Sequence, residues 1–165
     1  MRQFLVDDKG CVLIALWGVP TATYHDDCRR ALAASVRIRS KLLDMKMPGS
    51  SGITTGVVYC GTVGNTLRRE YAAVGEVVNL AARLMCKAKG EILMDENTYG
   101  RLPEEVRKKL RKQLPMVVKG KAKPINYYLF DSTHTIQEDG RLGASIVNSA
   151  LDEELPIRQI CKDAF

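Results

Sequence analysis

Asn79 and Arg83 are the two side chains of this sequence whose types and spacing are best suited to binding one ligand together. They lie four residues apart within residues 76–87, where Leu80 and Leu84 recur at helical spacing and predict a helix. Side chains four apart on a helix are neighbours on one face. The helix would therefore present an amide beside a planar, permanently charged guanidinium. The alternative is an exposed arginine and a helix-internal asparagine with no functional role.

A second candidate is Lys119, in the turn Lys119-Gly120-Lys121 between predicted strands at residues 116–118 and 127–130. A compact ammonium group on a glycine-containing turn suits a phosphate partner. The alternative is a solvated turn lysine. Glycines also punctuate the preceding region, where they allow close backbone approach or positive φ and carry no chemistry of their own. They are Gly56, Gly61, Gly64 and Gly75.

These side chains must be positioned by alternating strands and helices. We predict a hairpin from strands 3–6 and 11–17, the second a continuous apolar run buried on both faces. The remaining predicted elements are a helix at 26–46, a strand at 53–60, a connection to residue 75, the helix at 76–87, a strand at 91–94, a turn at 96–102 capped by Asp95, and a helix from Pro103 to about Lys112. Neighbouring hairpins among the helices predict the α+β class, a mostly antiparallel sheet with helices packed on it.

Composition limits the class of protein. The 165 residues are 45% hydrophobic and 27% charged, as in ordinary globular proteins. We predict one domain at residues 1–130 and a linker or tail at 131–165, where the composition becomes polar. No apolar run reaches about 18 residues, so no membrane span is expected. Five scattered cysteines without a CxxC pair predict reduced thiols and a cytoplasmic location.

The net charge of +6 is concentrated between residues 101 and 123, a stretch that contains nine lysines and arginines and only two glutamates. This run is typical of a solvated helix face followed by a turn; the alternative is a site for a polyanion. Aromatic residues make up only 6% of the chain and do not interleave with the basic residues. Because single-stranded nucleic acids are usually held by such aromatic platforms, we do not expect nucleic acid as a partner.

Two stretches, in order, carry a family resemblance. They are Gly52-Ile-Thr-Thr-Gly56-Val-Val-Tyr-Cys-Gly61-Thr-Val-Gly64 and Tyr71-Ala-Ala-Val-Gly75-Glu-Val-Val-Asn79-Leu-Ala-Ala-Arg83-Leu84, flanked by ALWG at 15–18 and VKGK at 118–121. Together they resemble the class III nucleotidyl cyclase domain. The DDKGC hairpin at residues 7–11 is most similar to the second cyclase domain of the bicarbonate-responsive soluble adenylyl cyclases.

The resemblance implies a ferredoxin-like core whose first strand would precede Met1, and an active site shared by two cyclase domains. It implies that Asn79 orients the ribose of ATP, that Arg83 stabilises charge on the α-phosphate, and that Lys119 contacts the terminal phosphates. Lys9 resembles a lysine assigned to adenine recognition or to the neighbouring regulatory pocket. Strict alignment on Gly10 would put Asp7 at the purine position instead.

Two positions depart from the family pattern. Two aspartates normally hold the catalytic Mg²⁺ ions; one would precede Met1, and Cys11 stands after Gly10 where the other is expected. A thiol does not replace a carboxylate for Mg²⁺, which prefers oxygen ligands. We therefore expect Mg²⁺ to be held by the partner domain and not by this chain. Ala72 stands where the family has an adenine-reading aspartate or threonine, which leaves the choice of nucleotide open.

The resulting hypothesis is the metal-free half of a soluble-type adenylyl cyclase, a lyase that makes cyclic AMP and pyrophosphate from ATP. It would be inactive alone and active with a metal-bearing cyclase domain in cis or in trans, with bicarbonate as a candidate regulator. One alternative is a degenerate, non-catalytic cyclase domain for dimerisation or small-anion sensing. Another is a basic interaction domain that acts through residues 101–123.

Overall fold

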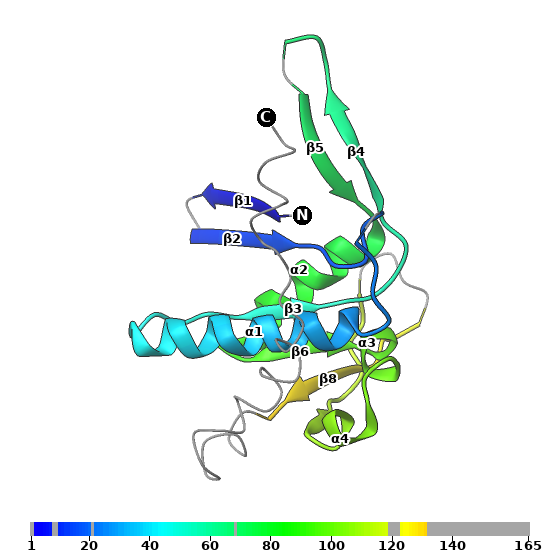
Figure 1. Ribbon diagram of the computed structural model, residues 1–165. Coiled ribbons are helices and arrows are strands. Elements are labelled where there is room, and N and C mark those ends of the chain that lie inside the picture. Colours follow the sequence, from blue (N-terminus) through cyan, green and yellow to red (C-terminus); the bar gives the residue numbers. More distant parts are fainter. Residues whose placement is uncertain (1, 8–9, 21, 68, 119–122, 132–165) are drawn as a thin grey trace.

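The computed structural model describes residues 2–7, 10–20, 22–67, 69–118 and 123–131, which form two hairpins and a four-stranded sheet. One hairpin pairs β1 (Arg2–Asp7) with β2 (Gly10–Ala15), and the other pairs β4 (Tyr59–Gly64) with β5 (Arg69–Val74). Both are antiparallel. Figure 1 shows β4 and β5 extending away from the rest of the molecule.

The four-stranded sheet has the order β3-β6-β8-β7. Its strands are β3 (Ser51–Ile53), β6 (Ile92–Asp95), β8 (Tyr127–Phe130) and β7 (Leu110–Lys112). β3 runs parallel to β6, and β8 runs antiparallel to both of its neighbours. The sheet is therefore mixed, and β6 lies inside it with a partner on each side.

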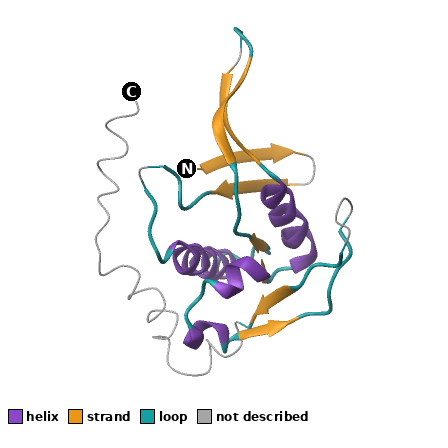
Figure 2. Cartoon of the chain, turned by 90° about the vertical axis from the view of Figure 1, so that its right-hand side faces the viewer, coloured by secondary structure: helices purple, strands orange, loops and turns teal. Residues whose placement is uncertain are grey.

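Two long helices cover opposite faces of this sheet. Alternate residues of a strand point to opposite faces, and in β6 the buried Ile92 and Met94 join one apolar cluster while Leu93 joins another. The first cluster contains Leu32 of α1 (Asp27–Asp44), and the second contains Leu84 of α2 (Glu76–Ala88). The sheet is thus sandwiched between α1 and α2, as Figures 1 and 2 show from two sides.

Two short helices complete the described fold. The first, α3 (Glu96–Gly100), directly follows β6, and the second, α4 (Glu104–Arg107), precedes β7. Asp95 caps α3, because its Oδ1 accepts a hydrogen bond from the Thr98 amide at 2.9 Å. This is the cap that the sequence predicts, and the helices at 26–46 and 76–87 are confirmed to within two residues.

The apolar run after the first turn is not buried on both faces, so that prediction was wrong. β2 ends at Ala15, and along it exposed Cys11 and Leu13 alternate with half-buried Val12 and Ile14. The reason is the strand's position: β2 pairs only with β1, and this hairpin lies outside the four-stranded sheet.

The strand predicted at 53–60 is divided into two. β3 ends at Ile53, and β4 begins at Tyr59 after residues 54–58. The predicted connection up to residue 75 contains the β4–β5 hairpin, whose loop is stabilised where Asn65 Oδ1 accepts a hydrogen bond from the Leu67 amide at 2.9 Å. Glycines are typical of turns, but the pairing of β4 with β5 places Gly61 and Gly64 in an extended strand.

The helix predicted from Pro103 to Lys112 is also shorter, because α4 ends at Arg107 and residues 110–112 form β7 against β8. The strand expected at 116–118 is reduced to a single bridge between Met116 and Ile125, whereas β8 matches its prediction. The α+β class is confirmed, with the strands in separate sheets instead of one. The turn at 119–121 and residues 132–165 of the predicted tail lie outside the described residues.

Candidate functional site

Asn79 and Arg83 are both exposed on α2, whereas Leu84, one residue further along, is fully buried. The helix is held by its opposite side, where Leu80, Leu84 and Ala88 pack with Leu93 of β6. The amide and the guanidinium, one helical turn apart, thus lie away from the core on one face. The prediction that these two residues are neighbours on a helix is confirmed.

Close contact with β3 fixes the position of α2. A Cβ atom on Gly52 would lie 2.6 Å from the Met85 amide nitrogen and nearer still to the Ala81 carbonyl oxygen. Real Cβ atoms do not approach backbone so closely, so only glycine lets β3 lie directly on this helix. The sheet and the helix that carries Asn79 and Arg83 are therefore packed backbone to backbone.

The two other candidate side chains, Lys119 and Lys9, lie outside the described residues. The structure thus brings Asn79 and Arg83 together and leaves the two lysines as expectations. Val118, which precedes Lys119 in the chain, is buried.

Cys11 and Ala72, the two departures from the family pattern, lie on different hairpins. Cys11 is exposed in β2 opposite Val6, and Ala72 is half-buried in β5 opposite Gly61. The thiol at the first position does not fit Mg²⁺, which prefers oxygen ligands. Among the described residues, no three histidine, cysteine, aspartate or glutamate side chains are grouped as a metal site would need.

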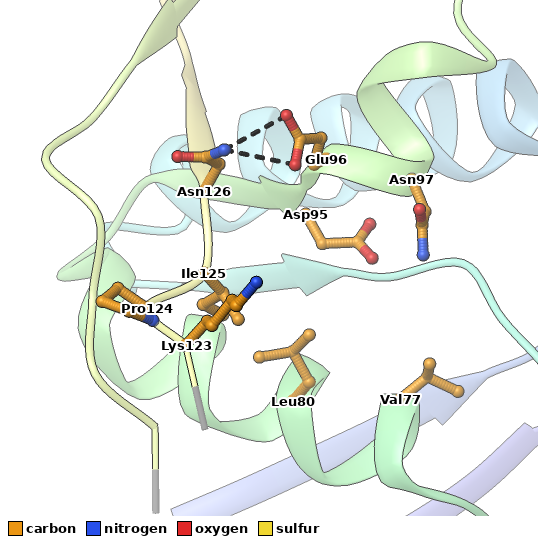
Figure 3. A pocket seen from close by; sticks show the side chains of 9 residues that line it. All are labelled: Val77, Leu80, Asp95, Glu96, Asn97, Lys123, Pro124, Ile125 and Asn126. Atoms are coloured by element: carbon orange, nitrogen blue, oxygen red, sulfur yellow. Dashed lines mark hydrogen bonds between the residues drawn. The ribbon is translucent and has the colours of Figure 1, made fainter. Parts of the chain in front are cut away.

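A pocket of about 360 Å³ lies on the other side of α2, and sequence reasoning missed it. Val77 and Leu80 of α2 form an apolar wall, with polar groups from the start of α3 and from residues 123–126 around it (Figure 3). Asn126 Nδ2 donates to both carboxylate oxygens of Glu96 at 3.2 Å and joins the two polar segments. The lining residues are Val77, Leu80, Asp95, Glu96, Asn97, Lys123, Pro124, Ile125 and Asn126.

Asp95 is the most deeply buried acid of this pocket. Burial raises the pKa of its carboxyl group above the ordinary value of 3.8, against the opposing effect of hydrogen bonds from Thr98. Thr98, fully buried, also shares a hydrogen bond of 2.8 Å between its Oγ1 and that of Thr55. Asp95 thus belongs to a polar network that crosses from α3 to the segment after β3.

The basic run forms no single continuous feature. Arg101 follows α3, Lys108 follows α4, and Lys112 ends β7, all three of them exposed. Arg111 forms a salt bridge with the buried Asp131. The positive charge is thus spread over several elements, and Asp131 offsets part of it.

A comparison of sequences decides the family. The sequence model described as "Adenylate and Guanylate cyclase catalytic domain" matches residues 31–131, well over half of this chain. The chain belongs to this cyclase family. The family match includes Asn79, Arg83 and Lys119, whereas Lys9 and Cys11 precede the matched residues.

Known cyclases are similar to this chain in sequence and in fold. Adenylate cyclase type 10 of Rattus norvegicus is 37% identical over 129 residues, which cover 75% of this chain and 8% of the rat protein. The crystal structure of the adenylyl cyclase CyaB from P. aeruginosa superposes with a TM-score of 0.61 at 25% identity, covering 78% of this chain and 70% of that chain. The guanylate cyclase domain of RhGC from Catenaria anguillulae, solved in complex with GTP, shares the fold with a TM-score of 0.62 at 23% identity, covering 78% and 71%.

This cyclase chain spans about 8% of the length of the rat relative. The fold predicted from the resemblance is confirmed by the family match and by both solved structures. Within the described part of the chain, no helix combines the length and the hydropathy that a bilayer crossing demands.

Proposed function

We propose that this cyclase domain is one half of an adenylyl cyclase and converts ATP to cyclic AMP and pyrophosphate together with a second cyclase domain. The observation that carries the proposal is the shared exposure of Asn79 and Arg83 on one face of α2. Neither side chain belongs to the buried core, and both are exposed on the face that a ligand arriving with a partner would approach. The similarity to adenylate cyclase type 10 supports ATP as the substrate.

In this reaction the ribose 3′-oxygen attacks the α-phosphorus, a new P–O bond forms, and the bond to the β-phosphate oxygen breaks. The 3′-hydroxyl proton leaves to solvent, and pyrophosphate departs. The Asn79 amide orients the ribose, and the Arg83 guanidinium opposes the negative charge that develops on the α-phosphate. Lys119 holds the terminal phosphates. A preorganised donor of this kind stabilises the transition state more than the ground state.

The metal-binding carboxylates belong to the partner domain in this proposal. Cys11 occupies the position that the family pattern gives to one of them, and its thiol does not suit Mg²⁺. The chain alone would then lack activity, and the partner would act in cis or in trans. Lys9 is proposed as a contact to adenine or to the adjoining regulatory pocket, with bicarbonate as a candidate regulator. A cytoplasmic location completes the proposal.

The experiment mixes the purified chain with a cyclase domain that carries both metal-binding aspartates, and measures cyclic AMP formed from ATP and Mg²⁺. Arg83→Ala is expected to lower the rate about 10²–10³-fold, as removal of a transition-state donor commonly does. Arg37→Ala is the matched control, because Arg37 is also an exposed arginine on a long helix, α1. Equal rates for Arg83→Ala and the unchanged chain would contradict the proposal.

A second candidate function is favoured by Cys11 and Ala72 together, since neither supplies the polar group of the family pattern. In that case the domain pairs with a cyclase partner and binds no nucleotide for chemistry. Titration of ATP into the assembled complex separates the two functions, because the second predicts assembly without any ATP-dependent product.

A further inference from the structure

Residues 52–56 run along α2 and contact it at successive turns. Gly52 lies against the backbone at Ala81 and Met85, and a Cβ on Gly56 would come within 2.5 Å of Val77 Cγ1. Between these two glycines, Thr54 Oγ1 donates a hydrogen bond of 2.7 Å to the carbonyl oxygen of Val77. The first turn of α2 is thus held by a side chain from outside the helix.

The start of α2 has no side-chain cap at its N-cap residue. Gly75 precedes the helix, and its carbonyl oxygen accepts hydrogen bonds from the amides of Val78 at 3.1 Å and Asn79 at 3.4 Å. The hydrogen bond from Thr54 adds a contact from outside the helix, at the Val77 carbonyl oxygen of this same turn.

The residue after Thr54 is fixed by hydrogen bonds to α1 and α3. Its neighbour Thr55 shares a hydrogen bond of 2.8 Å with Thr98 Oγ1 and one of 3.4 Å with Cys28 Sγ. The Thr55 carbonyl oxygen accepts from Asn97 Nδ2 at 3.3 Å. Consecutive threonines therefore connect α1 and α3 on one side to the first turn of α2 on the other.

We propose that Thr54 is a positioning residue of the cyclase site: its hydroxyl group fixes the first turn of α2 and, through it, Asn79. The inference rests on the function proposed above. Asn79 follows Val77 by two residues in the same turn, so a shift of the Val77 carbonyl moves the Asn79 amide with it. A misplacement of about 1 Å in a reacting constellation can cost about 10²-fold in rate.

The test compares Thr54→Val, Thr54→Ser and Arg83→Ala in the same two-domain assay. Thr54→Val keeps the shape and removes the donor; it is expected to lower kcat about tenfold, the worth of one hydrogen bond, with a smaller change in KM for ATP. Thr54→Ser keeps the hydroxyl and is expected to restore most of kcat. Thr23→Val is the matched control, since Thr23 makes the same kind of bond, to Val19, in the segment before α1.

Hydrogen exchange supplies a readout besides activity. In Thr54→Val the amides of Val78 and Asn79 are expected to exchange faster, while those of Leu93 and Met94 in β6 keep their rates. Faster exchange throughout the chain would indicate general destabilisation and overturn a positioning role.

The kinetic outcomes separate the two proposals. If Arg83→Ala loses activity and Thr54→Val does not, the role of Thr54 is wrong and the proposed function stands. If Thr54→Ser is as impaired as Thr54→Val, the hydroxyl group is not the cause and the inference also fails. If Arg83→Ala keeps full activity, or the unchanged complex makes no cyclic AMP, the proposed function fails first.

Discussion

The sandwich around the four-stranded sheet and the β4–β5 hairpin use apolar residues in opposite ways. Leu32 and Phe130 in the sandwich are 0% and 1% exposed, whereas Val57 and Leu67 at either side of β4 are 95% and 94% exposed. The sandwich buries its apolar surface within the chain and derives its stability from that burial. The β4–β5 hairpin is supported mainly by the pairing of its own two strands. The residues that stabilise the fold and the most exposed apolar residues therefore lie in different parts of this domain.

The largest difference between the two regions is expected on truncation of apolar side chains. Phe130→Ala should lower the free energy of unfolding by ~3–5 kcal/mol, because it leaves a cavity between α1 and the sheet. Leu67→Ala should change it by less than ~0.5 kcal/mol, because that side chain is already in water. Urea unfolding followed by circular dichroism measures both, and similar losses for the two variants would break the comparison.

Gly52→Ala is expected to have the next largest effect, a loss of ~1–3 kcal/mol, because the new methyl group would press β3 against the backbone of α2. Gly100→Ala is its control: a Cβ there meets nothing within 4 Å, and the change should be neutral or slightly stabilising. Thermal unfolding of the two variants distinguishes them. A stable Gly52→Ala protein would mean that strand and helix are packed less closely than described.

The smallest effect concerns Asp95 and appears only as pH varies. Burial raises the pKa of this carboxyl group above 3.8, so the folded chain keeps its proton to higher pH than the unfolded chain does. The contribution of Asp95 to the free energy of unfolding therefore falls as pH rises from about 3.8 to the raised pKa, and it is constant above that pKa. Asp95→Asn can still cap α3 and does not titrate.

The free energy of unfolding of Asp95→Asn, relative to that of the unchanged chain, should therefore increase as pH rises through this acidic interval. Urea unfolding of both proteins at a series of pH values measures the difference. A difference that stays the same or shrinks as pH rises would show that burial does not dominate at Asp95.

Local patterns were sufficient for the two long helices, α1 and α2, and for the Asp95 cap, because helical spacing and the chemistry of one carboxylate act over a single turn. They failed between residues 53 and 75, where β3 leaves the sheet after Ile53 and cross-strand pairing forms a hairpin. Burial on both faces of β2 was also misjudged, because an apolar run does not reveal which strands will lie beside it.

In the candidate site, too, local patterns predict some features and miss those that join distant segments. The face shared by Asn79 and Arg83 follows from helical periodicity, and the roles proposed for them come from the order of motifs along the chain. The pocket beside Asp95 and the bond from Thr54 to Val77 join segments that are far apart in the sequence. No periodicity signals them, although two glycines flanking Thr54 at 52 and 56 do mark a close approach of backbones.

The absence of a side chain at Gly52 has a mechanical consequence for the whole domain. With no side chain between Gly52 and the backbone of α2, strand and helix have little room to slide past each other at this point. Arg83 lies between Ala81 and Met85 in the chain, so the strand holds the helix at residues on either side of this guanidinium.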